Sequence, residues 1–254
     1  MSGVVEMLTR HPVKGFTPEQ VQSVTLAPGS GFPWDRSFAV EDGPSGFDPN
    51  APGHVSKQKF TVLAKIPAVA RVRTRFDDAS QTFHAEAPDA APIAARLDTN
   101  EGRDAFAAWL TDVLRDDIRG PLRVLPAPGG HRFFDHPQGL VSLINLASVR
   151  DIERRIGRHV DPLRFRANIY VSGWPAWSEL ETENRTLTSG DTRMRVFKPI
   201  TRCAATHVDP DTGARDIEMV ETLHREYGHL LCGLYLHVEQ GGELKVGDAA
   251  AFAS

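Results

Sequence analysis

The sequence is poor in cysteine, with two residues in 254, Cys203 and Cys232. Two cysteines cannot form the disulfide framework of a small secreted domain. Nor can they alone supply the ligands of a structural zinc site or of an iron–sulfur cluster. The sequence therefore excludes a disulfide scaffold and an internal cluster that stores electrons.

Long hydrophobic runs are also missing. The first fifteen residues contain no apolar stretch of the length found in signal peptides. The most apolar segment, residues 140–149, is too short to cross a bilayer and contains Ser142, Asn145 and Ser148. We therefore expect a cytoplasmic protein that makes no membrane contact.

Basic residues are fewer than acidic ones: the sequence has 29 Lys and Arg and 33 Asp and Glu, which gives a formal net charge of −4. This balance excludes a protein that binds nucleic acid through overall positive charge, so no nucleic acid is expected among its partners. Arginine is nevertheless far more frequent than lysine among the basic residues, with 23 Arg and 6 Lys. Because a guanidinium binds phosphate and carboxylate in bidentate geometry, a local anion site remains compatible with the acidic total.

Several common catalytic motifs are missing as well. The sequence contains no P-loop, no GxSxG nucleophile elbow and no HExxH zinc motif. Ten histidines raise the question of a metal site, but two close pairs, His131 with His136 and His224 with His229, are five residues apart and would diverge on a helix. Exposed or core imidazoles are the simpler interpretation.

The chain does contain a mainly β pattern with a few helices, an α+β composition that we expect to form a barrel. The pattern predicts strands over 37–41, 68–76, 81–85, 167–172, 191–197, 204–208, 233–239 and 243–246. Residues 85–95 resemble a surface connection. Helices are predicted after a cap at Thr99 or Asn100, over 147–156 before Gly157, and over 217–227 before Gly228.

One cysteine has neighbours that suggest chemistry. Cys203 ends the segment Lys198-Pro-Ile-Thr-Arg-Cys and is followed by a turn signal, Asp-Pro-Asp-Thr-Gly, at 209–213. A lone cysteine in a β protein is usually a small buried hydrophobe. Positive charge from Lys198 and Arg202 would favour the thiolate, which is the nucleophile and metal ligand. Cys232, in an apolar segment, is expected to be a core residue.

Two further segments could bind an anion. One is His-Pro-Val-Lys-Gly at 11–15, which Asp35-Arg36 follows about twenty residues later. The other is Leu-Arg-Phe-Arg-Ala-Asn at 163–168, where alternation would put Arg164 and Arg166 on one face of a strand. Each has a plain alternative: Asp35-Arg36 as a surface ion pair, and the two arginines as a solvated strand edge.

Taken in order, these segments resemble the MOSC family, the C-terminal domain of molybdenum cofactor sulfurase, together with its N-terminal β-barrel partner. The resemblance rests on six segments: PVKG, DR before a strand, RFRAN, KPITRC, VDPDTG and QGGELKVGD. It implies a MOSC-type β-barrel over residues 116–254 and an N-terminal, β-rich, barrel-like MOSC-associated domain over residues 1–115. Within the family, the amidoxime-reducing members are the most similar.

The resemblance implies that Cys203 is a ligand of molybdenum in the molybdenum cofactor and the catalytic residue. It implies further cofactor-binding positions at Lys14, Arg36, Arg166, Asn168, Thr201 and Arg202. The implied activity is an oxidoreductase that reduces N-hydroxylated or other N-oxygenated small substrates. The alternative is a non-catalytic carrier that holds the cofactor, or a persulfide, on Cys203. The family is also associated with pyridoxal phosphate binding.

Two positions depart from the family pattern. Gly15 stands where the reductases often have serine, and residues 136–139 lack the polar loop of those relatives, so the substrate is left open. The sequence has no nicotinamide fingerprint, no haem motif and no cluster-forming cysteines. The implied reaction therefore needs an external electron donor, a ferredoxin- or cytochrome-type protein, besides its small-molecule substrate.

Overall fold

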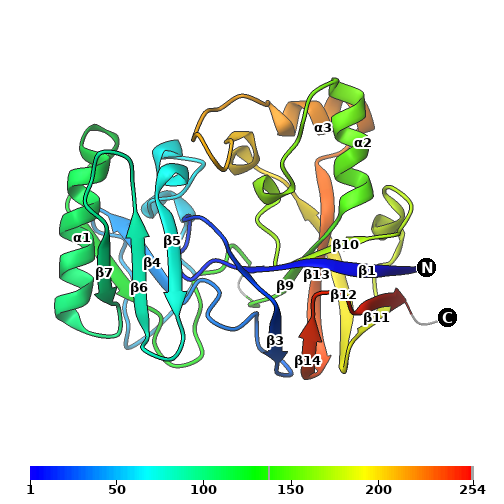
Figure 1. Cartoon of the computed structure of the whole chain (residues 1–254), viewed down its shortest axis with the longest axis horizontal. Helices are drawn as coiled ribbons and strands as arrows, with labels where there is room; N and C mark the ends of the chain where they lie inside the picture. The colour runs from blue at the N-terminus through cyan, green and yellow to red at the C-terminus, as the bar shows by residue number, and fades with distance from the viewer. Residues whose placement is uncertain (137, 253–254) are drawn as a thin grey trace.

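The computed structural model describes residues 1–136 and 138–252, which form two lobes lying side by side (Figure 1). Strands make up most of the regular secondary structure of the described chain, which also has three α-helices and several short 3-10 turns. The mainly β fold class expected from the sequence is therefore confirmed. Among the described residues, no helix has the length and apolar character needed to cross a membrane.

One lobe is a closed barrel of seven strands in the described chain. Its sheet order runs β10-β9-β13-β12-β11-β15-β1, and β1 pairs again with β10 to close the ring. All neighbouring pairs are antiparallel except β10 with β9. The strands are β1 (Ser2–Arg10), β9 (Val141–Asn145), β10 (Ile169–Ser172), β11 (Thr186–Ser189), β12 (Thr192–Thr201), β13 (Leu231–Gln240) and β15 (Ala249–Phe252).

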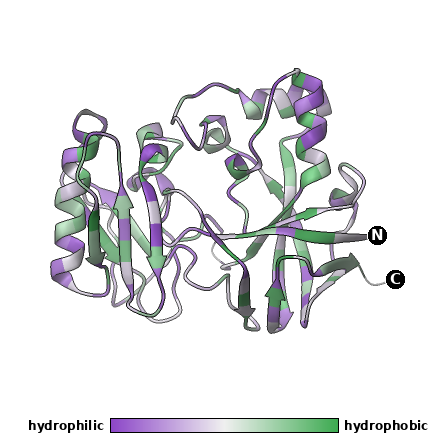
Figure 2. Cartoon of the chain, in the orientation of Figure 1, coloured by the Kyte–Doolittle hydropathy of each residue, from purple (hydrophilic) through white to green (hydrophobic). Residues whose placement is uncertain are grey.

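The barrel is filled by side chains that alternate along its strands. On β12, buried and exposed positions alternate from Thr192 to Val196, as a strand with one face on a core requires. Val5, Leu143 and Leu234 belong to the interior cluster and are fully buried. Figure 2 shows this alternation as hydrophobic bands along the barrel strands. Two short pairs extend the lobe: β2 (Glu19–Val21) on β1, and β3 (Ser23–Leu26) with β14 (Gly242–Lys245).

Two helices cover one end of the barrel. Helix α2 (Leu146–Ile156) begins at Asn145, whose side chain accepts a hydrogen bond from the backbone of Ala147, and ends at the left-handed Gly157. Helix α3 (Met219–Tyr227) ends at the left-handed Gly228. Both helices lie above β10 and β13 (Figure 1). The expected helices over 147–156 and 217–227 are confirmed within two residues.

The second lobe packs two small sheets against helix α1 (Asn100–Leu114). The sheets are β4 (Phe38–Asp42) with β8 (Leu122–Pro126), and β5 (Arg73–Asp77), β6 (Thr82–Glu86) and β7 (Ile93–Arg96). Thr99 caps α1 by accepting a hydrogen bond from the backbone of Gly102, as the sequence predicts. Val208, from the chain of the barrel lobe, is buried in the same hydrophobic cluster, so the lobes share packed surface.

Several local predictions are wrong. Residues 68–76 are a 3-10 turn, η2 (Pro67–Arg71), and then β5, because Pro67 fixes a helical φ at the start of the segment. Residues 204–208 form η6 (Ala204–His207) and no strand. The segment 85–95, expected to be a connection, contains the end of β6 and the start of β7. The remaining 3-10 turns are η1 (Lys57–Lys59), η3 (Arg115–Asp117), η4 (Pro162–Phe165) and η5 (Ser178–Glu181).

Strand β1 carries the chain from one lobe to the other. It lies in the barrel, between β10 and β15, although it comes first in the sequence. The residues that follow it, 11–15, meet the first residue of β4 through a bridge between Val13 and Phe38. Lys14 therefore lies where the lobes meet. The expected domain division after residue 115 stays a prediction.

Candidate active site

A cavity of about 290 Å³ opens between the lobes. Its walls come from the segment after β1, the residues before β4, η1, the loop between β8 and β9, η4 and the end of β12. The structure brings together all seven residues that the sequence singles out: Lys14, Arg36, Arg166, Asn168, Thr201, Arg202 and Cys203. They come from positions spread over nearly 190 residues, so it is the fold that brings them to one cavity.

Cys203 lies two residues after the end of β12, in the N-cap position of η6. Its backbone oxygen accepts hydrogen bonds from the backbone nitrogen of Thr206 at 3.0 Å and from the Thr206 hydroxyl at 2.9 Å. These two bonds fix the residue while its side chain stays partly exposed in the cavity. The thiol is therefore available for chemistry and is no core hydrophobe.

The cation beside this thiol is Lys57, whose Nζ lies 3.2 Å from Cys203 Sγ. Among the described residues, it is Lys57 that contacts the thiol and neither sequence neighbour, so the expected effect of Lys198 and Arg202 on it stays a prediction. Lys198 lies over the ring of Phe197 at 5.3 Å. Burial acts to lower the pKa of Lys57, but the charges of Cys203 and Asp135 outweigh it and raise the pKa above its ordinary value.

Arg36 is held by a buried ion pair rather than a surface one. The Asp35 carboxylate is fully buried, accepts a hydrogen bond from the Arg36 guanidinium, and accepts another from the backbone nitrogen of His11 at 2.7 Å. Burial would raise the pKa of Asp35, but Arg36 and the His11 contact hold it far below its usual range. The Arg36 guanidinium also donates to the backbone oxygen of Arg166 at 3.1 Å.

Arg166 does not lie on a strand, and it shares no strand face with Arg164. Asp161 caps the turn η4, Pro162 begins it, and Arg166 ends it in the left-handed region with φ of 52°. Its Nη1 donates to the backbone oxygen of Phe16 at 2.8 Å. Burial and the nearby Arg36 charge lower its pKa to about 10, so the guanidinium is charged at neutral pH. Two cations in strained left-handed conformations, Arg36 and Arg166, thus face one cavity.

Lys14 is buried and also lines the cavity. Its Nζ donates to the backbone oxygen of Phe133 at 2.9 Å and to Asp135 Oδ1 at 2.5 Å. Burial lowers the pKa of Lys14, against the opposing effect of Asp135. Partial desolvation acts to raise the pKa of Asp135, but the charges of Lys14, Lys57 and Arg36 bring it to about 2. Asp135 is the one acidic side chain among the described residues that line the cavity.

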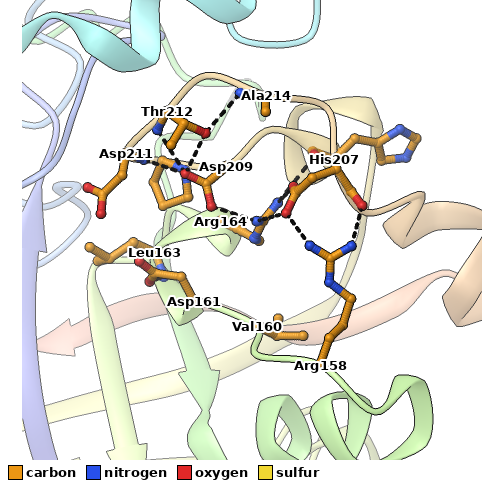
Figure 3. Close-up of polar contacts among 12 residues, drawn as sticks. Arg158, Val160, Asp161, Leu163, Arg164, His207, Asp209, Asp211, Thr212 and Ala214 are labelled. Atoms are coloured by element: carbon orange, nitrogen blue, oxygen red, sulfur yellow. Dashed lines mark hydrogen bonds and ion pairs between the residues drawn. The ribbon is translucent and has the colours of Figure 1, made fainter.

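Arg164 supports the cavity wall from behind. Its buried guanidinium forms ion pairs with Asp209 at 2.9 Å and Asp216 at 2.8 Å. The other carboxylate oxygen of Asp209 accepts from the backbone and hydroxyl of Thr212, which closes the Asp-Pro-Asp-Thr-Gly turn (Figure 3). Arg158 pairs with Asp216 at 2.7 Å from the outside. Arg164 is therefore neither a solvated strand edge nor a free anion ligand.

The polar groups of Asn168 and Arg202 are used within the protein. Asn168 Oδ1 accepts from the backbone and hydroxyl of Ser142, and its Nδ2 donates to the backbone oxygen of Thr9, so it joins three chain segments. Arg202 donates to the backbone oxygens of Cys232 and Phe165. Thr201 is exposed at the cavity edge.

Cys232 is fully buried, and burial raises the pKa of its thiol to about 12. It is a core residue, as the sequence indicates. Sequence reasoning missed Lys57, Asp135 and Tyr235, which also line the cavity. No local pattern marks them, because each reaches the site through the fold of a loop or strand far from Cys203 in sequence.

The arrangement combines one accessible thiol with several fixed cations. In the described part of the chain, no three His, Cys, Asp or Glu side chains come together as metal ligands. A metal bound here would therefore take one soft sulfur ligand from the protein and the others from a cofactor. The surrounding cations suit a cofactor that carries phosphate.

Comparison with known protein families finds a match for each of the two parts of the chain. Residues 2–117 match the family model described as the MOSC N-terminal beta barrel domain, and residues 130–251 match the MOSC domain. The chain belongs to the MOSC family. The seven convergent residues therefore line a cavity between the N-terminal lobe and the barrel of a MOSC protein.

Curated relatives are similar at modest identity. Mitochondrial amidoxime-reducing component 1 of Mus musculus is 36% identical over 118 residues, covering 42% of this chain and 34% of the relative. The human protein of that name is 33% identical over 176 residues, covering 58% of this chain and 52% of the relative. Molybdenum cofactor sulfurase of Anopheles gambiae is 28% identical, covering 90% of this chain and 33% of that protein. The matches thus span between a third and a half of the relatives' length.

Among solved structures, the YUAD protein from Bacillus subtilis aligns over 98% of this chain and 94% of its own, with a TM-score of 0.46 and 14% identity. Of the curated relatives named above, one carries the molybdenum cofactor in its name, the sulfurase of Anopheles gambiae.

Proposed function

We propose that this MOSC protein binds the molybdenum cofactor and reduces N-hydroxylated or other N-oxygenated small substrates with electrons from a partner protein. The observation that carries the proposal is the convergence of Cys203 with Lys14, Arg36 and Arg166 on one cavity. A thiolate suits molybdenum that a dithiolene already holds. Relatives named amidoxime-reducing components support the reaction class.

The fit of the cofactor rests on the donor set. Lys14, Arg36 and Arg166 would hold its phosphate through charge-assisted hydrogen bonds. Their own partners, Asp135, Asp35 and the backbone oxygen of Phe16, hold each cation in place before any ligand arrives. Cys203 would bind the metal. The bound cofactor supplies two-electron transfer to the substrate, and the protein supplies orientation and charge.

Reduction of an N–OH group to N–H consumes two electrons and two protons and releases water. The sequence offers no redox centre other than the proposed cofactor, so a ferredoxin- or cytochrome-type donor is part of the proposal. Purified protein that turns over with NADH alone, without dye or partner, would contradict it.

The test is expression with molybdate, element analysis of the purified protein, and a dye-linked assay with benzamidoxime. We expect bound molybdenum and reduction to benzamidine. Cys203→Ser should lower turnover by at least about a hundredfold, a loss of about 2.7 kcal/mol in transition-state stabilisation, because a serine hydroxyl stays protonated at neutral pH. Pterin content should persist, since the phosphate contacts are intact. Normal turnover by folded Cys203→Ser would refute the assignment of the ligand.

A second candidate is a carrier that holds the cofactor or a persulfide on Cys203 without turnover. The match to molybdenum cofactor sulfurase over 90% of this chain favours it. The same preparation distinguishes the two: a carrier contains molybdenum or sulfane sulfur but shows no reductase activity with any dye.

A further inference from the structure

Lys57 occupies the sulfur end of the cavity. It begins η1, on the lobe opposite the barrel, and is half-buried against the end of β12. Its Nζ is 3.2 Å from Cys203 Sγ, across a sequence separation of 146 residues. A long side chain from one lobe thus meets the thiol of the other, inside the cavity that both lobes line.

The other cations of the cavity are held elsewhere. Lys14 is bound by Asp135, Arg36 by Asp35, and Arg166 by the backbone oxygen of Phe16. Arg164 and Arg202 are likewise held by two carboxylates and by backbone oxygens.

Lys57 differs from all of these. Among the residues that the structure describes, Cys203 Sγ is the hydrogen-bond partner of its ammonium, which has three donors. A group bound to Cys203 Sγ would replace Lys57 as the contact of this sulfur. The ammonium of Lys57, which the Asp135 charge also attracts, would then face whatever lies beside the sulfur.

We infer that Lys57 selects substrates by charge: it favours N-oxygenated substrates that carry a negative group, such as a carboxylate, over cationic ones. This rests on the proposed function. At the effective dielectric of a partly buried site, the attraction between unit charges a few ångströms apart exceeds the free energy of about a tenfold change in affinity. The ammonium therefore changes substrate binding measurably.

The first test needs no cofactor. Cys203 of the cofactor-free protein is alkylated with iodoacetate, an anion, and with iodoacetamide, which is neutral. Both reagents attack the same thiolate, so the ratio of their rates is independent of the thiolate fraction and reports local charge. Cys232 is fully buried, and Cys203→Ser provides the blank.

Lys57→Met should lower the iodoacetate to iodoacetamide ratio by about fivefold or more, and Lys57→Glu should lower it further. The matched control is Lys59→Met, which removes an exposed lysine from the same turn and should leave the ratio within about twofold. An unchanged ratio in Lys57→Met, or an equal fall in Lys59→Met, would overturn the inference. Circular dichroism confirms that each variant is folded.

The second test uses the loaded enzyme with benzamidoxime and its 4-carboxylate. Lys57→Met should raise KM for the carboxylate by about fivefold and leave KM for the neutral compound nearly unchanged. Equal changes for both compounds would overturn the inference. A loaded enzyme that reduces no N-oxygenated compound would refute the proposed function instead, and the alkylation ratio would still test Lys57.

Discussion

Replacing Asp35 by asparagine removes one charge from the best-buried ion pair of the site while keeping the side chain's shape. The Asp35 carboxylate is 0% exposed and bonds both the Arg36 guanidinium and the backbone nitrogen of His11. An asparagine oxygen can still accept from His11. The guanidinium of Arg36, with 16% of its side chain exposed, loses its counter-charge.

Removing one partner of a buried ion pair typically costs 3–5 kcal/mol, because the other charge stays buried and uncompensated. Arg36 keeps its hydrogen bond to the backbone oxygen of Arg166 and some contact with solvent. We therefore expect Asp35→Asn to lower the free energy of unfolding by about 3 kcal/mol, at the lower end of that range. The exposed pair of Asp98 with Arg96 provides the control, and Asp98→Asn should leave stability nearly unchanged.

The assay is urea unfolding of the cofactor-free protein at pH 7, on Asp35→Asn, Arg36→Gln and the double variant. The double variant should be less destabilised than the sum of the single variants, because it removes both charges. A loss below about 1 kcal/mol for Asp35→Asn, or strict additivity, would refute the reasoning.

The same pair predicts a pH dependence. The pKa of Asp35 lies below its usual value in the folded protein, whereas an unfolded aspartate titrates near about 3.9. Its contribution to stability is therefore complete above that value and is lost as the pH falls below it. In Asp35→Asn, the fall in stability over this acidic range should be shallower than in the parent protein.

Three further predictions concern the core and one helix end. Cys232→Ser buries a hydroxyl at a fully buried position and should lower the free energy of unfolding by about 1–3 kcal/mol, measured by urea unfolding. Burial and the charges of Arg36 and Arg166 hold the pKa of His11 well below its usual value. Because unfolded histidine binds a proton near about 6.5, stability should fall as the pH drops below that value, by up to about 1.4 kcal/mol per pH unit, and His11→Gln should flatten this slope between pH 7 and 5. Thr99→Ala removes the cap of α1 and should cost about 1 kcal/mol, and a cost near zero would show that the cap is dispensable.

The helix ends of this protein could be predicted because their signals are local. Asn145 and Gly157 bracket α2 with a side-chain acceptor and a left-handed glycine, and Thr99 acts similarly on α1. The alternation of Arg164 and Arg166 predicts a strand face over 163–168, which is wrong because the turn signal just before this segment is the stronger one. Asp161 and Pro162 form a cap and a first helical residue, and they place Arg166 at the end of a turn.

Which residues line the cavity could be predicted only from the family resemblance, which rests on the order of the motifs along the chain. Spacing alone does not show that Arg36 and Arg166 share a wall. Lys57 carries no motif, and its contact with Cys203 depends on how the two lobes pack. The same is true of Asp135, whose low pKa arises from Lys14, Lys57 and Arg36, three cations from three separate segments.

Strand β1 has a consequence for synthesis on the ribosome. It pairs with β15, so Ser2 lies opposite Ala251, nearly the whole described chain away. The barrel cannot close until its last strand has left the exit tunnel, and until then β1 presents unpaired backbone groups. The lobe containing α1, by contrast, finds its sheet partners within residues 38–126. The order of emergence thus leaves the β15 edge of β1 open until the end of synthesis, although β1 can pair earlier with β2 and β10. We expect closure of the barrel to be slow, because its closing contacts are so distant in sequence.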